Sequence, residues 1–229
     1  MNQSEFDQFA DEYTRQHSRN VRLSGETPDY FAEYKVRDIS RHLGSRSTLA
    51  LDVLDFGAGV CSSLPWFRKH LPDCRITCLD VSVRSLEIGA MRFPDAASFV
   101  SFDGRNIPVA DRSFDVVLAA CVFHHIPAKE HAPLLEQIRR VLRPSGVFAL
   151  FEHNPFNPLT VHAVNTCEFD ANAVLIRATE MRDRIRRAGF ETARITYRMF
   201  FPRVLSIFRP IEPLLGWCPV GAQYSIFAN

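Results

Sequence analysis

The sequence predicts an α/β fold in which a largely parallel sheet is covered by helices. From residue 50 onward, short apolar runs rich in β-branched residues alternate with amphipathic stretches, the pattern of strands and crossover helices. A loop with two glycines follows the first apolar run, as in sheets that bind nucleotides. The 229 residues fit one domain with a continuous core, so we expect a single unit.

Seven segments are expected as strands, and helices are expected between several of them. The strand candidates are 49–56, 74–81, 97–102, 114–122, 146–152, 191–201 and 221–229. The helix candidates are 61–70, 83–92, 128–142 and 179–188. Thr179 is the predicted N-cap of the last helix and Gly189 its C′ residue, while Arg143–Gly146 predicts a helix-ending turn. Four prolines in 201–220 favour an antiparallel return of the last strand over a crossover helix.

The chain divides into three parts by pattern. Residues 1–48 carry spaced aromatic side chains among polar ones, which predicts amphipathic helices over one edge or mouth of the sheet. This helical cap could serve as a substrate lid or only as packing. Residues 49–152 hold the glycine loop and form the expected cofactor-binding half, and residues 153–229 form the expected substrate-side half.

Composition excludes several function classes. The net charge of +1 gives no bulk attraction to nucleic acid or to anionic membranes. No apolar run reaches the roughly 18 residues of a membrane span, so no integral membrane association is expected. The polar N-terminus lacks the apolar core of a signal peptide, which predicts a cytoplasmic location. The six cysteines contain no CxxC pair and are expected to be reduced core residues such as Cys74 and Cys78.

The ends of the predicted strands carry the chemistry, because ligands of open parallel sheets bind beyond the carboxyl ends of the strands. In chain order these ends deliver Asp55 with Gly57 and Gly59, Asp80, Asp103 with Gly104, Cys121–His125, and Glu152–Asn154. The glycines allow close approach of backbone to a ligand, and a carboxylate at a second strand end can accept ribose hydroxyls. Any one aspartate could be a cap or turn residue, but together they favour an adenosyl pocket.

Five motifs in order complete the pattern and carry a family resemblance. They are Asp55-Phe56-Gly57-Ala58-Gly59, Leu79-Asp80-Val81-Ser82, Phe102-Asp103-Gly104, Ser113-Phe114-Asp115-Val116-Val117 and Val141-Leu142-Arg143-Pro144-Ser145-Gly146. With them the chain resembles class I S-adenosylmethionine-dependent methyltransferases over residues 49–152. It is most similar to the small-molecule, type 11-like group with a His-His pair after strand four, here His124-His125. Ser145 departs from the usual Pro-Gly-Gly turn.

The resemblance implies a fold, a cofactor and its contacts. The fold would be a Rossmann-like, doubly wound, seven-stranded sheet whose last strand lies antiparallel between the fifth and sixth. S-adenosylmethionine would be the methyl donor, leaving S-adenosylhomocysteine, with no metal. The residues implied to line the cofactor are Asp55, Gly57, Gly59 and Cys121 at its methionine part, Asp80 at its ribose, Asp103 and Gly104 at its adenine, Val81 as a further contact, and Tyr13 as a closing aromatic side chain.

The acceptor side is less determined by the sequence. An oxygen acceptor needs its proton removed unless it is already ionised, and His124, Glu152 and His153 are the candidate catalytic residues in that order. The strand-four histidine could instead pack and bond locally. The expected activity is methyl transfer to a small organic acceptor, with oxygen favoured over nitrogen or carbon. A non-catalytic cofactor-binding module is the alternative, and the missing third glycine disfavours a nicotinamide-dependent oxidoreductase.

Two further segments bear on the acceptor and on partners. Asn154-Pro155-Phe156 resembles a motif of DNA amino-methyltransferases but follows strand five instead of strand four, so nucleic acid is not expected. It fits a rigid turn that shapes the pocket or serves structure alone. Residues 200–215 are apolar with interspersed Arg203 and Arg209. They could form a lid, a homodimer contact, a face for a lipidic acceptor, or ordinary packing, which is the reading we favour.

Overall fold

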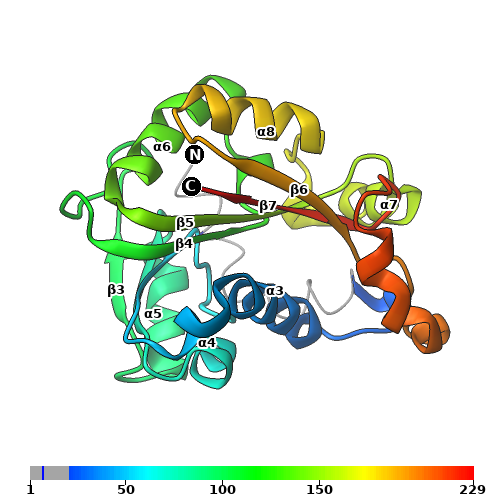
Figure 1. The fold of residues 1–229 in the computed structure, drawn as a ribbon, viewed down its shortest axis with the longest axis horizontal. Helices are drawn as coiled ribbons and strands as arrows, with labels where there is room; N and C mark the ends of the chain where they lie inside the picture. The colour runs from blue at the N-terminus through cyan, green and yellow to red at the C-terminus, as the bar shows by residue number, and fades with distance from the viewer. Residues whose placement is uncertain (1–6, 8–20) are drawn as a thin grey trace.

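One seven-stranded sheet organises the part of the chain that the structure describes, which is residue 7 and residues 21–229 of a computed structural model (Figure 1). Every strand predicted from the sequence is present, with boundaries shifted by a few residues. The strands are β1 (Asp52–Phe56), β2 (Arg75–Asp80), β3 (Ser98–Ser101), β4 (Phe114–Ala120), β5 (Leu142–His153), β6 (Ala193–Arg198) and β7 (Gln223–Ala228).

The strand order is β3-β2-β1-β4-β5-β7-β6, and β7 alone runs antiparallel to its neighbours β5 and β6. This confirms the seven-stranded sheet with an inserted antiparallel last strand. The chain winds outward from β1 to β3 and then returns to place β4 on the other side of β1. That reversal opens a crevice at the carboxyl ends of β1 and β4, where doubly wound sheets bind their ligands.

Helices cover both faces of the sheet. Figure 1 shows α6 and α8 against one face and α3, α4 and α5 against the other. Apolar side chains of each set are buried in a core on their own side of the sheet, for example Leu135 of α6 and Ile39 of α3. The α-helices are α3 (Pro28–Leu43), α4 (Leu64–His70), α5 (Val83–Arg92), α6 (Ala128–Val141), α7 (Pro158–Asn165) and α8 (Ala178–Arg187), and the 3₁₀ segments are η1 (Val21–Ser24), η2 (Gly44–Thr48), η3 (Phe123–His125), η4 (Glu168–Asp170) and η5 (Arg203–Leu215).

Two local predictions need correction. The N-cap of α8 is Arg177, with no side-chain cap, so Thr179 lies inside the helix; Gly189 does follow the C-cap, at φ 94°. The Arg143–Gly146 segment is a bulge within β5, because the register against β4 jumps from Phe114↔Leu142 to Val116↔Val147. Arg143 forms ion pairs with Asp115 and with Asp52 on adjacent strands, which fixes the bulge to the sheet.

The expected N-terminal cap is present as α3, whose Thr27 N-cap side chain accepts a hydrogen bond from the Tyr30 backbone N–H. Tyr34 of α3 is buried edge-to-face on Phe151 of β5, and its hydroxyl donates to Gln223 of β7. The cap is thereby attached to the middle of the sheet, beside the crevice. No described helix is long and apolar enough to cross a membrane.

The segment between β6 and β7 is η5, which packs against the chain that leads into α3. The Arg209 guanidinium lies 2.7 Å from the Glu26 carboxylate and 4.8 Å above the centre of the Tyr30 ring. Several apolar η5 side chains are exposed, Val204 and Ile207 most of all. All six cysteines are free, and Cys74 and Cys78 are buried as expected for small core residues.

Candidate active site

Two cavities meet at the carboxyl ends of β1 and β4. The first, which we call the glycine-loop cavity, has a volume of about 130 Å³. Its lining comes mainly from the loops after β1 and β2, with α3 on the opposite side. Its polar and main-chain walls are contributed by Asp55, Gly57, Ala58, Gly59, Ser62, Ser63, Asp80, Val81 and Ser85.

The two glycines serve different structural purposes in this loop. Both have positive φ, 72° for Gly57 and 52° for Gly59. A Cβ on Gly57 would lie 2.6 Å from Val122 Cγ2, so the position needs glycine for packing against the loop after β4. A Cβ on Gly59 would meet nothing within 4 Å. Gly59 therefore leaves room where a ligand can approach the backbone.

Asp55 offers an unsatisfied buried acceptor to a ligand. Its carboxylate is only 2% exposed and lines the glycine-loop cavity, and Oδ2 has no hydrogen-bond partner among the described residues. Burial, and to a lesser degree the charge of Asp80, raises the pKa of Asp55 to about 7, against an opposing hydrogen bond from Ser63. A cationic group such as an amino acid ammonium would both satisfy Oδ2 and stabilise the ionised form.

Asp80 ties the two loops of this cavity together. Its Oδ2 accepts a hydrogen bond from the Gly59 N–H at 2.7 Å, and Oδ1 accepts one from the Ser82 N–H at 2.8 Å. Burial raises the pKa of Asp80, and the backbone N–H donors oppose that rise. The next residue, Val81, lines the cavity as well. Asp80 thus fixes the glycine loop while still facing the space where a ribose was expected.

The other predicted cofactor residues are placed less favourably. Asp103 is exposed, does not line the cavity, and accepts hydrogen bonds from the backbone N–H groups of Arg105 and Asn106 at 2.8 and 2.7 Å. It is here the turn residue that the sequence allowed as an alternative, and Gly104 beside it has φ 79°. Phe102 supplies the cavity wall at this strand end instead. Tyr13 lies outside the described residues.

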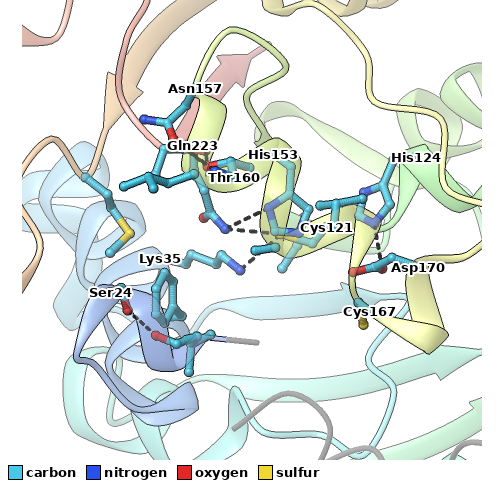
Figure 2. A pocket seen from close by; sticks show the side chains of 18 of the residues that line it. Ser24, Lys35, Cys121, His124, His153, Asn157, Thr160, Cys167, Asp170 and Gln223 are labelled. Carbon is cyan, nitrogen blue, oxygen red and sulfur yellow. Dashed lines mark hydrogen bonds and ion pairs between the residues drawn. The ribbon is translucent and has the colours of Figure 1, made fainter. Parts of the chain in front are cut away.

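The second cavity, which we call the histidine cavity, has a volume of about 210 Å³ (Figure 2). It is largely apolar, and its lining comes from segments far apart in the sequence: η1, α3, the loop after β4, the chain from β5 to η4, and the chain after β6. The polar side chains that line it are Ser24, Lys35, Cys121, His124, His125, His153, Asn157, Thr160, Cys167, Asp170 and Gln223.

His124 and Glu152, the preferred catalytic pair from the sequence, form a buried ion pair with 2.6 Å between His124 Nδ1 and Glu152 Oε2. Glu152 Oε1 also accepts hydrogen bonds from the Val122 and Phe123 N–H groups at 3.0 and 2.7 Å. Burial alone would raise the pKa of Glu152, but the charge and hydrogen bond of His124, followed by the charge of His153 and the Phe123 N–H, lower it to about 2. Burial likewise opposes protonation of His124, yet the adjacent carboxylates raise its pKa to about 10. These shifts favour a role in holding the loop after β4 over a role in accepting a proton.

His153, the third candidate, lines the histidine cavity, and the ion pair of Glu152 is formed by His124 and not by His153. Its Nδ1 lies 3.5 Å from Nε2 of Gln223 on β7. Figure 2 shows His153 beside Gln223 and Cys121 among the residues that line the cavity. Of the three predicted catalytic residues, His153 is therefore best placed to exchange a proton with a molecule in the cavity.

Both cavities share a wall, formed by Phe31, Lys35, Ala120, Cys121 and His125. Lys35 Nζ lies 3.4 Å from Cys121 Sγ. Burial alone would raise the pKa of the Cys121 thiol, but the charge of Lys35 and the neighbouring His153 lower it to about 7. Cys121 also has a positive φ of 59°, rare for a residue with a Cβ. Cys121 thus lies beside the glycine loop, as expected, and also faces the second cavity.

Lys35, Gln223 and Asp170 were missed by sequence reasoning. Lys35 had one available signal: it is a lone lysine among the aromatic residues of the N-terminal region. Gln223 begins the last strand and Asp170 lies in a loop after the predicted fifth strand, and neither is part of a recognisable motif. Packing of distant segments brings them to the cavity.

The known proteins that this chain resembles in sequence are methyltransferases. Residues 54–150 match the family model described as a methyltransferase domain. The chain is 33% identical over 105 residues to a demethylmenaquinone methyltransferase of Thermotoga maritima, covering 46% of this chain and 44% of that one. It is 33% identical over 111 residues to a human thiol S-methyltransferase, covering 45% and 43%. The matches thus span less than half of these curated relatives.

The fold also matches solved structures along nearly the whole chain. A Thermotoga maritima structure, described as an S-adenosylmethionine-dependent methyltransferase and possible histamine N-methyltransferase, superposes with a TM-score of 0.69. The match covers 99% of this chain and 98% of that one at 19% identity. At that identity the match shows a shared fold.

Proposed function

We propose that the chain is a class I S-adenosylmethionine-dependent methyltransferase and that it transfers a methyl group to a small, mostly apolar organic acceptor through an oxygen nucleophile. One observation carries this proposal. A cavity with several polar side chains at the glycine loop and a second, more apolar cavity lined by histidines meet at a common wall that contains Lys35 and Cys121. Donor and acceptor can therefore occupy separate cavities and react where the two adjoin.

The residues of the glycine-loop cavity fit the donor. The unpartnered Oδ2 of Asp55 suits the ammonium of its methionine part, and the open space at Gly59 suits close approach to the backbone. Asp80 keeps acceptor capacity for ribose hydroxyls beyond its two backbone hydrogen bonds. Bound S-adenosylmethionine supplies a methyl group that is already activated by a sulfonium. The protein then has to orient the acceptor, exclude water and remove a proton.

The histidine cavity can perform these three tasks. Its apolar lining excludes water from the acceptor, and His153 on its wall can take the proton of a hydroxyl. Lys35 favours an ionised acceptor at the shared wall, as it favours the ionised Cys121 thiol. His153 thus takes the proton from the acceptor oxygen, and the charge of Lys35 stabilises the negative charge left on that oxygen.

A thiol acceptor is the second candidate, on one specific observation. The pKa of the thiol of Cys121 is lowered to about 7 at the shared wall, with Lys35 the main cause. The same charge would ionise an acceptor thiol placed beside it, and one of the matched relatives is named a thiol S-methyltransferase. Another matched relative is named a C-methyltransferase of ubiquinone and menaquinone biosynthesis, and product analysis separates transfer to carbon or nitrogen from transfer to oxygen or sulfur.

A matched acceptor panel tests the proposal. Phenol, thiophenol, aniline and a quinol carrying the same apolar substituent are incubated with the full chain and methyl-labelled S-adenosylmethionine. We expect the phenol to be methylated fastest, and His153→Gln to lower kcat by about 100-fold, within the usual range for a general base. The matched control His162→Gln replaces an exposed histidine outside the cavity and should keep kcat.

The outcomes separate the alternatives. Methylation of only the thiophenol would replace the oxygen acceptor with a sulfur one. Tight binding of S-adenosylhomocysteine with no transfer to any nucleophile would favour a binding module without activity. Calorimetry that detects neither the donor nor S-adenosylhomocysteine, together with a fluorescence response to NADH, would overturn the proposal.

A further inference from the structure

Three potential metal ligands converge at one side of the histidine cavity. His125 Nε2 lies 3.4 Å from Asp170 Oδ1, and His124 Nε2 lies 3.7 Å from the same oxygen. One ligand atom from each of the three side chains lies within 4.8 Å of the others. The histidines come from η3 and the aspartate from η4, so two distant segments meet here (Figure 2).

The spacing of these atoms fits a shared cation. Tetrahedral zinc with bonds of about 2.0–2.1 Å places neighbouring ligand atoms about 3.3 Å apart. The separations of 3.4 and 3.7 Å are close to that edge length.

A carboxylate behind the cluster orients one of the ligands. Glu152 Oε2 lies 2.6 Å from His124 Nδ1, which leaves Nε2 directed to Asp170. A histidine bonded to a carboxylate through one nitrogen and to a metal through the other is the common arrangement of protein zinc sites. Glu152 and Asp170 also bring two carboxylates to a cluster whose side chains are at most 12% exposed. The ion would take the place of the proton that His124 carries in its ion pair with Glu152, since histidine binds a metal in its neutral form.

We propose that His124, His125 and Asp170 bind a divalent metal ion, with zinc the best match to a set of two imidazole nitrogens and one carboxylate oxygen. All three residues line the histidine cavity, so an open coordination position would face the acceptor. There the ion would bind the oxygen or sulfur of the acceptor's hydroxyl or thiol, and the proton released would pass to His153 on the same cavity wall. That last role rests on the proposed function, whereas metal binding itself does not. The site departs from the metal-free one that the sequence predicted.

Metal titration of the full chain tests the site directly. Protein freed of metal with a chelator is titrated with Co²⁺ and followed by visible absorption, and then with Zn²⁺ by calorimetry. We expect one equivalent to bind, with an absorption spectrum of four- or five-coordinate cobalt that Zn²⁺ abolishes. Asp170→Asn and His125→Gln should each weaken binding at least tenfold, since the first replaces a charged carboxylate ligand with a neutral amide and the second removes an imidazole ligand.

Matched controls come from exposed residues nearby. Glu168→Gln changes a carboxylate on the same 3₁₀ segment as Asp170, and His162→Gln changes an exposed histidine on α7. Both should bind metal like the unmodified chain. Absence of stoichiometric binding in the unmodified chain would overturn the site, and so would equal binding in all variants.

Failure of this site and failure of the proposed function give different results. Asp170 lines only the histidine cavity, so Asp170→Asn should still bind S-adenosylhomocysteine with unchanged affinity, which also reports that the variant is folded. Metal binding without any methyl transfer would leave the site and remove the function. Methyl transfer by a chain that binds no metal would do the reverse.

Discussion

The glycine-loop cavity and the histidine cavity are neighbours that are built in opposite ways. The first takes most of its polar wall from two short segments, 55–63 and 80–85, and much of that wall is backbone. The second takes side chains from segments between residue 21 and residue 223. A donor that is common to a family can therefore be recognised by local main-chain geometry. The acceptor is recognised by side chains that only the tertiary fold brings together.

The largest expected effect concerns the buried ion pair at the wall of the histidine cavity. Glu152→Gln removes the charge that pairs with His124 and weakens the acceptor for the Val122 and Phe123 N–H groups. Because breaking a buried ion pair leaves an uncompensated charge, we expect the free energy of unfolding to fall by about 3 kcal/mol. Urea unfolding of the metal-free chain measures it. The exposed Glu168→Gln should change it by less than about 0.5 kcal/mol, and equal losses would contradict the account.

The next effect concerns the glycine-loop cavity. Asp80→Ala removes the carboxylate that holds the Gly59 and Ser82 N–H groups and faces the expected ribose. Losing charged hydrogen bonds of this kind should weaken S-adenosylhomocysteine binding by about 100-fold, as measured by calorimetry. Retained affinity would mean that the donor binds elsewhere.

The difference between the two cavities explains which of their residues could be predicted from the sequence. Asp55, Gly57, Gly59 and Asp80 lie at strand ends with fixed spacing, so the local pattern is enough to bring them to the lining of one cavity. Lys35 and Asp170 could not be assigned, because their positions depend on how α3 and η4 pack against the sheet. The bulge at Arg143–Gly146 was also missed, since ion pairs to two other strands stabilise it.

The shared wall gives a smaller effect that depends on pH. The thiolate is the reactive form of cysteine, so alkylation of Cys121 by iodoacetamide should increase as the pH rises through about 7. Lys35→Gln removes the positive charge that stabilises the thiolate, so the midpoint should rise by about one unit. Peptide mapping by mass spectrometry isolates Cys121 from the other cysteines. Lys69→Gln, at an exposed position 57% accessible, should leave the midpoint in place, and an unchanged midpoint in Lys35→Gln would rule out the pairing.

The smallest expected effect concerns Asp103, for which the structure and the sequence motif imply different roles. Asp103 is engaged in a surface turn, so Asp103→Ala should weaken S-adenosylhomocysteine binding by less than about threefold, within the effect of a surface substitution. Calorimetry beside Asp80→Ala provides the scale. A loss as large as that of Asp80→Ala would return Asp103 to the adenine contact that the motif implies.

The most direct test of the central claim, that donor and acceptor meet at the shared wall, is a crystal structure with bound S-adenosylhomocysteine. We predict the ammonium at Asp55, the ribose at Asp80, and the sulfur at the wall beside Cys121 and Lys35, facing the histidine cavity. A sulfur atom that faces away from that cavity, or a ligand bound outside the glycine-loop cavity, would contradict the account.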